Sequence, residues 1–130
     1  MADNPHALIG SAVYSVLSAG TVPVYHSLAP QETGLPYAIM QPQQPGVDAY
    51  TFGAGREISA DWVVKIISDR QWPGQAINLF SYVDGLMQDA ALSVAGWSVL
   101  RCRRVSAIQY VDPDRFWHVG GVYRVDLSKV

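Results

Sequence analysis

Three histidines and several aspartates are the side chains of this sequence that could support acid–base or nucleophilic chemistry. His6, His26 and His118 stand among many serines, and a hydrolase needs a nucleophile, a base and a group that orients the base. No serine stands in a nucleophile-elbow motif. One enzymatic alternative is kept, a small hydrolase in which His118 acts with Asp112 or Asp126.

The sequence predicts neither a metal site nor a cofactor. His118 has no second histidine or acidic residue at a spacing typical of metal ligands, so we interpret it as a surface or interface histidine. The Gly-Ala-Gly at 53–55 is followed by Arg56 and lacks the further glycines or the lysine of nucleotide-binding fingerprints. We interpret it as the tip of a hairpin.

Cys102 and the aspartates near Pro113 have structural explanations. Nearby cations lower the pKa of a thiol, but alternation along a strand would send the neighbours of Cys102 to the opposite face, so we expect an inert, buried thiol. Asp112 and Asp114 are explained by a turn around Pro113. A single cysteine excludes an internal disulfide framework and a multi-cysteine zinc site, and it fits a reducing compartment.

The spacing of apolar residues predicts an α+β domain. In chain order we expect a helix at about 5–18, strands at about 22–25, 37–41 and 58–67, a helix at about 73–89, and strands at about 97–111 and 116–127. Residues 27–36 are expected to be loop, and 42–55 a long exposed loop or hairpin tip. Short connections favour a mixed, mostly antiparallel sheet of about five strands, covered by two amphipathic helices and carrying long protruding loops.

Composition indicates one globular domain, residues 1–130, with little surface charge. The chain has 130 residues and 14.2 kDa, 49% of them apolar and 15% charged, against about 25% charged in typical domains. We therefore expect part of the surface to meet another subunit. A net charge of −2 and a pI near 5.8 argue against a general nucleic-acid binder. No membrane-spanning segment or signal peptide is indicated, so we expect a soluble, unexported protein.

Arginines form the densest charge cluster, at Arg101, Arg103 and Arg104. Three interpretations remain open for them. They can form a solvated strand face with cross-strand partners such as Asp126, bridge subunits through forked contacts with carboxylates, or face nucleic acid.

The four tryptophans are core candidates first, because aromatic residues on strand faces are mostly buried. They are Trp62, Trp72, Trp97 and Trp117. Trp72, beside Pro73, has the alternative of anchoring a contact with another protein.

Five stretches, which together span nearly the whole chain, carry a resemblance to a known family. They are "VPVYHSLAP", "LPYAIMQP", "EISADWVVKIISD", "GQAINLFSYVDGLM" and "RVSAIQYVDPDRFWHVGGVYRVDL", preceded by an amphipathic N-terminal helix. Their order and texture resemble the tail terminator, or tail-completion, proteins of long-tailed bacteriophages and related gene-transfer particles.

The resemblance implies a structural protein without enzymatic activity. Such a protein forms a six-fold ring on the finished tail tube, stops tube growth and offers the head connector a docking surface. The implied partners are further copies of the chain, the tail tube protein and a head connector or stopper protein, with DNA passing unspecifically through the lumen and no membrane involved. The implied location is the head-proximal end of the virion tail, after synthesis in the cytoplasm of the bacterial host.

Contact residues follow from position in the chain. We expect the 43–56 loop to protrude and touch the tube or the lumen, with candidate contacts at Gln43, Gln44, Asp48, Tyr50, Phe52 and Arg56. Candidate inter-subunit contacts are Arg101, Arg103, Arg104 and Trp72. The alternative within the same particle is a head–tail adaptor or stopper, which would also form a ring but would bind the portal side.

Overall fold

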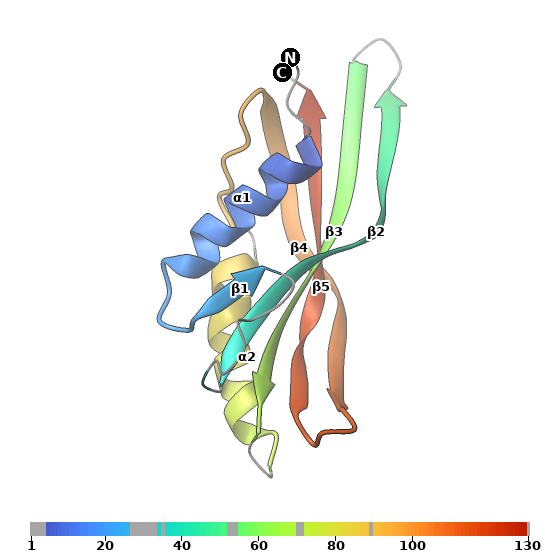
Figure 1. The fold of residues 1–130 in the computed structure, drawn as a ribbon. Helices are drawn as coiled ribbons and strands as arrows, with labels where there is room; N and C mark the ends of the chain where they lie inside the picture. The colour runs from blue at the N-terminus through green and yellow to red at the C-terminus, as the bar shows by residue number, and fades with distance from the viewer. Residues whose placement is uncertain are drawn as a thin grey trace.

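The computed structural model describes residues 5–26, 34, 36–51, 55–69, 72–88 and 90–129, and for residues 5–6, 44–51, 55–57 and 129 it describes the backbone alone. In chain order the elements are α1 (Pro5–Ser18), β1 (Val24–His26), β2 (Tyr37–Thr51), β3 (Gly55–Ser68), α2 (Gly74–Met87), β4 (Trp97–Val111) and β5 (Trp117–Lys129) (Figure 1). The predicted α+β class and the element order are confirmed.

The strands form one sheet in the order β1-β2-β3-β5-β4. The short β1 pairs with β2 in parallel, and all the other neighbours are antiparallel. The C-terminal strand β5 therefore lies inside the sheet, while β4 lies at one edge. This is the mixed, mostly antiparallel sheet that the sequence predicts.

The expectation of a long loop at 42–55 was wrong for most of that range. Strand β2 continues to Thr51 and pairs with β3, from Val47 opposite Ser59 to Thr51 opposite Gly55. The register shifts between Gln43 and Val47, which marks an irregularity in the strand. Prolines within the stretch favoured loop, but proline is tolerated at edges and bulges of a sheet. The predicted hairpin tip falls mainly on residues 52–54, which lie outside the described part of the chain.

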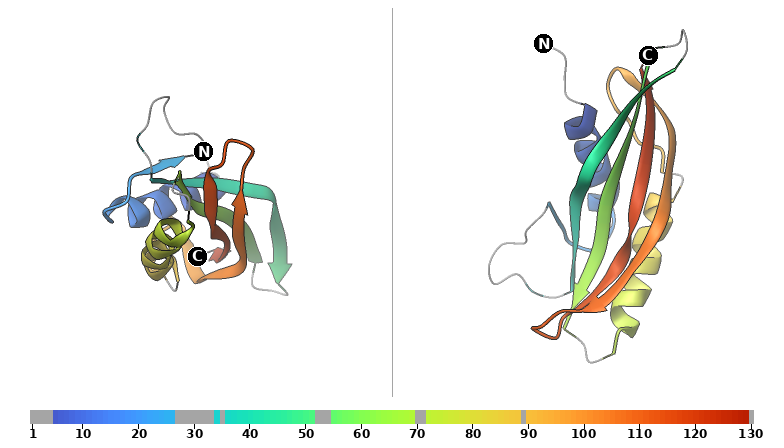
Figure 2. Two further views of the ribbon diagram at one scale, coloured as in Figure 1. Left: turned by 90° about the horizontal axis from the view of Figure 1, so that it is seen from below. Right: turned by 90° about the vertical axis from the view of Figure 1, so that its right-hand side faces the viewer.

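Both helices lie on the same side of the sheet and bury its apolar face (Figure 2). Ile9, Val13 and Leu17 of α1 recur at helical spacing and are buried, as are Phe80 and Val83 of α2. The facing strand residues alternate along β3 and β5, with every second side chain in the core: Ile58, Ala60, Trp62, Val64, Ile66, Val119, Tyr123, Val125 and Leu127. The period-two pattern in the sequence therefore assigned the core face of these strands correctly.

The opposite face of the sheet also holds buried apolar side chains. Val63 pairs with Val122 across β3 and β5, and Ile39 and Ile67 lie on the same face as this pair. All four are at most 8% exposed and lie outside the main core cluster. The sheet thus carries a second, smaller apolar patch on the side away from the helices.

Close strand packing requires glycine at position 120, where β5 pairs with β3 opposite Lys65. A Cβ atom built there would lie 2.1 Å from the carbonyl oxygen of Val64 and 2.5 Å from the Cα atom of Lys65. Both of those atoms belong to the backbone, so no side-chain rotation relieves the overlap. Gly85 in α2 is the opposite case, because its added Cβ would meet nothing within 4 Å.

We expect Gly120→Ala to lower the free energy of unfolding by about 3 kcal/mol, because the methyl group forces β3 and β5 apart. Gly85→Ala serves as the matched control and should raise the free energy of unfolding by about 0.5–1 kcal/mol, since alanine is the better helix former. Urea unfolding followed by circular dichroism measures both values. Equal stability of the two variants would contradict the close packing at Gly120.

Candidate functional site

The turn between β4 and β5 builds a polar cluster around Asp112. One carboxylate oxygen of Asp112 accepts hydrogen bonds from the backbone N–H groups of Asp114 (2.9 Å) and Phe116 (3.0 Å). The other oxygen lies 2.7 Å from His118 Nε2. The bond from His118, followed by that from the Phe116 N–H, holds the pKa of Asp112 below its usual range. The turn predicted around Pro113 is confirmed, and Asp112 is the residue that organises it.

His118 is held between aromatic and charged neighbours. Its ring stacks on that of Tyr110, with centroids 4.5 Å apart and planes at 8°, and Lys65 Nζ donates a hydrogen bond to the Tyr110 hydroxyl at 3.1 Å. His118 is only 9% exposed, so the expectation of a surface histidine was wrong for the isolated chain. The stacked Tyr110 and the short bond to Asp112 account for its burial.

The His118–Asp112 pair supplies two of the three groups of a hydrolase triad. Nε2 of His118 is occupied by Asp112, and Nδ1 is buried without a hydrogen-bond partner among the described residues. No serine or cysteine hydroxyl or thiol in the described part of the chain is bonded to either nitrogen. The other proposed partner, Asp126, lies eight positions further along the same strand, roughly 27 Å away at strand spacing. The geometry therefore favours a structural role for this pair.

Two of the three clustered arginines lie on the sheet face away from the helices. Arg101 pairs with Asp126 through Nε at 3.2 Å, and Arg103 stands opposite Arg124 in the register of β4 and β5. Arg124 in turn donates from Nε and Nη2 to Asp61, at 2.9 and 3.2 Å. These two hydrogen bonds to the Asp61 carboxylate raise the pKa of Arg124 above its usual value.

Arg104 lies on the helix side of β4. Its guanidinium approaches Asp84 of α2 at 3.5 Å and lies 5.8 Å from the centroid of the Phe80 ring. Asp84 also accepts a hydrogen bond from the hydroxyl of Tyr123. Burial, together with this bond to a carboxylate, raises the pKa of Tyr123, so the phenol stays protonated well into the alkaline range. The contacts of Arg104 thus join β4 and β5 to α2 within one subunit.

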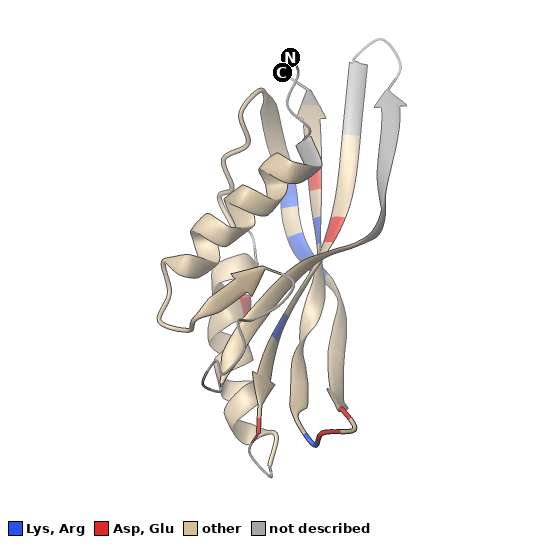
Figure 3. Ribbon diagram, viewed as in Figure 1, with Lys and Arg blue, Asp and Glu red and all other residues tan. Residues whose placement is uncertain are grey.

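Charges of opposite sign alternate across the sheet. Figure 3 shows blue and red segments next to each other on β4, β5 and β3. The ion pairs of Arg101, Arg104 and Arg124 neutralise most of the positive charge on this end of the sheet. The cross-strand partner expected for the arginine cluster, Asp126, is confirmed for Arg101.

Cys102 and the tryptophans mostly occupy core positions. Cys102 is 2% exposed and its thiol donates to the backbone oxygen of Met87, which confirms the buried thiol. Trp62 and Trp97 are buried and Trp117 is half-buried. Trp72 differs, with 79% of its surface exposed just before α2. Its large apolar surface is left for contacts outside the subunit, so its predicted contact role stays open.

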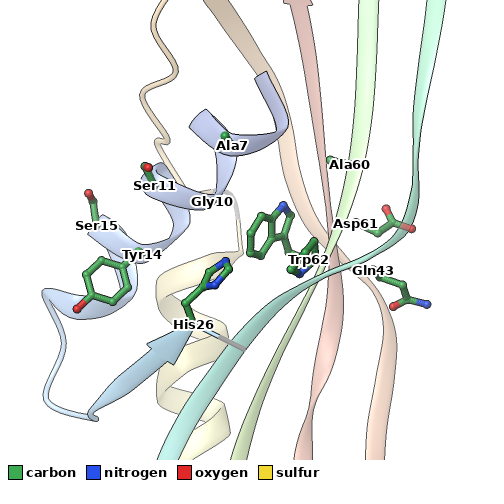
Figure 4. Close-up of a pocket in the computed structure, with 11 residues that line it drawn as sticks. Ala7, Gly10, Ser11, Tyr14, Ser15, His26, Gln43, Ala60, Asp61 and Trp62 are labelled. Carbon is green, nitrogen blue, oxygen red and sulfur yellow. The ribbon is translucent and has the colours of Figure 1, made fainter. Parts of the chain in front are cut away.

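A groove that was not predicted from the sequence lies between α1 and the β2–β3 part of the sheet (Figure 4). Its volume is about 850 Å³, and its floor includes the indole of Trp62, which lies 5.6 Å from the ring of His26. Gly10 of α1 packs directly on Trp62, because a Cβ atom there would come within 2.7 Å of the indole. The groove depends on segments distant in sequence, and Gly10 within an apolar helix was the only local signal for it.

The residues expected to touch the tube or lumen are only partly described. Gln43 is exposed on β2. Gln44, Asp48 and Tyr50 lie in β2 and Arg56 lies in β3. The structure describes only the backbone of these four residues. Phe52 lies outside the described residues. Their contact role stays a prediction, carried now by a two-stranded arm rather than by an irregular loop.

Within the described ranges, no group of three or more His, Cys, Asp or Glu side chains is placed to hold a metal ion. No helix among these residues is both long enough and apolar enough to cross a membrane.

Comparison with known proteins identifies the fold through solved structures. No protein-family model matches the sequence, and no curated protein matches it. A chain of the virion of a native gene transfer agent (GTA) particle superposes with a TM-score of 0.84 and 18% identity, over 98% of this chain and 99% of that chain. A second solved chain matches with a TM-score of 0.58 and 17% identity, over 96% of both chains. The protein therefore shares its fold with a chain of a gene transfer agent virion.

We expect Asp112→Ala to lower the melting temperature near neutral pH, because it removes the acceptor that holds the turn and His118. The pKa of the folded carboxyl is depressed, so its stabilising effect is complete above about pH 4, the usual aspartate pKa, and is lost as pH falls through the lower folded-state value. Melting curves from about pH 7 down to about pH 3 should show the difference from wild type shrinking at the acid end.

Asp114→Ala, at an exposed position in the same turn, is the control and should leave the melting temperature nearly unchanged across this range. A constant difference between Asp112→Ala and wild type at every pH would contradict the role given to the ionised carboxylate.

Proposed function

We propose that this chain is a structural virion protein that caps the completed tail tube of a tailed phage or gene-transfer particle. Copies form a ring, six-fold as the family resemblance implies, that ends tube polymerisation and presents a docking surface to the head connector. The observation that carries the proposal is the match of the whole fold, end to end, to a chain of a gene transfer agent virion. The sequence resemblance to tail terminators points to the particular place within the particle.

The surface of the subunit supports an assembly role. Trp72, Leu100 and Val111 are large apolar residues with at least half of their surface exposed, and they are available for contacts with another subunit. The polar cluster at His118 lacks a nucleophile among the described residues. Binding of one surface to another is enough for a cap, since a ring stops growth by fitting the last tube ring and offering no site for the next.

The charge pattern fits a channel through which DNA passes. Among the sheet arginines whose side chains the structure describes, Arg101, Arg104 and Arg124 are paired with aspartates of the same chain, so few of them remain free to hold phosphates. Affinity for DNA rises with the number of phosphate contacts, and a wall with few free cations lets the duplex slide. The proposed partners are the tail tube protein and the head connector or stopper, with the ring at the head-proximal end of the tail.

The purified protein should form a discrete species of six times 14.2 kDa and should bind tail tube protein in preference to connector protein. Light scattering over a wide concentration range measures the mass, and pull-down with each partner measures the preference. Binding to the connector alone would replace the terminator role with that of a head–tail adaptor. Binding to neither, in the monomeric or assembled state, would contradict both.

We expect the double variant Arg101→Ala/Arg103→Ala to weaken ring assembly while the subunit stays folded, because the Arg101–Asp126 ion pair is exposed and contributes little to stability. Arg104 is left in place, since its head group packs on α2 of its own subunit. Arg115→Ala, in the exposed β4–β5 turn, is the control for loss of positive charge. If light scattering gives the same mass for wild type, the double variant and Arg115→Ala, Arg101 and Arg103 do not contribute to the interface.

A further inference from the structure

The sheet has two open edges, on opposite sides. In the order β1-β2-β3-β5-β4, the outer edge of β4 has no neighbouring strand among the described residues. Strand β2 is covered by β1 only at Ala38–Met40, so its edge is open from Gln41 to Thr51 in the same described part of the chain. Open edges present unpaired N–H and C=O groups that pair readily with another strand.

Most of both edges carries features that discourage pairing. In β4 the register shifts between Val99 and Arg101 and again between Arg104 and Ser106, and three arginines lie in this half of the strand. In β2, Pro42 and Pro45 cannot donate, and the register shifts between Gln43 and Val47. Bulges, charges and prolines are the usual means of blocking an edge.

One five-residue stretch at each edge has neither a proline nor a register shift. In β4 it is Ala107–Val111, which is uncharged, free of proline and in continuous register with β5. Tyr110 and Val111 in this stretch are 44% and 50% exposed. In β2 it is Val47–Thr51, in continuous register with β3. Edges blocked elsewhere and left open here are typical of strands that pair with a defined partner.

The directions and charges of the two edges suit a second copy of the same chain. Each step from β2 through β3 and β5 to β4 is antiparallel, so β4 runs opposite to β2. If copies are related by rotation about an axis parallel to the strands, every copy keeps the same strand direction. Strand β4 of one copy then lies antiparallel to β2 of the next. Like charges do not oppose this pairing, because Ala107–Val111 is uncharged and Val47–Thr51 carries a single aspartate, Asp48.

We propose that copies of this chain join edge to edge, with Ala107–Val111 of β4 in one copy hydrogen-bonded antiparallel to Val47–Thr51 of the open β2 edge of the next. The contact is heterologous, so it repeats around a ring and closes when the rotation fits. The sheet then continues from subunit to subunit. This inference rests on the ring of the proposed function and names the surfaces that close it.

Paired cysteines test the contact. We mix chains carrying Gln109→Cys with chains carrying one cysteine at a position from Gln41 to Thr51, beginning with Ala49→Cys, and oxidise them or add a short bis-maleimide. The buried Cys102 stays in place in every chain. Within one copy these positions lie on opposite edges, separated by two strands and hence roughly 14 Å or more, too far for a disulfide.

We expect a linked dimer at a run of β2 positions, with about tenfold more product than for Ser81→Cys on the exposed side of α2, because pairing raises the effective concentration of the two thiols. Absence of this product at every β2 position overturns the proposal, as does a chain that stays monomeric at all concentrations. Caps on tail tubes without the cross-link would leave the proposed function standing and remove this contact. Cross-linked rings that ignore tail tubes would do the reverse.

Proline substitution provides a second test that separates assembly from folding. Successive backbone N–H groups of an edge strand point alternately toward the neighbouring strand and away from the sheet. One of the two variants Ile108→Pro and Gln109→Pro therefore removes a hydrogen bond to β5. The other removes an N–H group that would donate to the next subunit. The variant that keeps the wild-type melting temperature is the informative one, and it should reduce ring formation about tenfold, the change expected for a loss of about 1.4 kcal/mol. Undiminished ring formation in that variant would overturn the proposal.

Discussion

The pairing of β3 with β5 at close range is the constraint on which the rest of the structure depends. It is possible only because Gly120 lets the strand approach the backbone of Val64 and Lys65. With these two strands in the centre, their alternating apolar residues form one face that both helices cover. The polar side chains fall on the other face, where Asp61, Arg124 and Asp126 pair across strands. What remains for other molecules is the rim of the sheet, Trp72 and the groove beside α1.

Regular periodicity made most of the fold predictable, and its interruptions made the rest unpredictable. The alternation at 58–67 and the helical spacing at 73–89 identified elements and core faces because both elements pack on one continuous core. The stretch at 42–55 was misassigned because its prolines suit a loop and an edge strand equally well. The bulges in β4 could not be predicted, because a register shift does not change the amino-acid composition of a strand. Asp112 was rightly named as a partner for His118, whereas the stacking of Tyr110 depends on cross-strand register.

The small share of charged residues, 15% of the chain, has an explanation when the subunit is considered as part of an assembly. An assembly protein needs surfaces that stay unoccupied in the free chain and become buried in the particle. Ion pairs within the subunit neutralise Arg101 and Arg124, while Leu100, Tyr110 and Val111 stay exposed on the edge strand β4.

The position of β5 has a consequence for the order of events during synthesis. This strand is made last, yet it separates β3 from β4 in the finished sheet. Residues 57–68 must therefore wait for residues 117–128, about sixty positions later, before they pair, and such long-range contacts form slowly. The sheet is therefore discontinuous between β3 and β4 until β5 has paired with both of them.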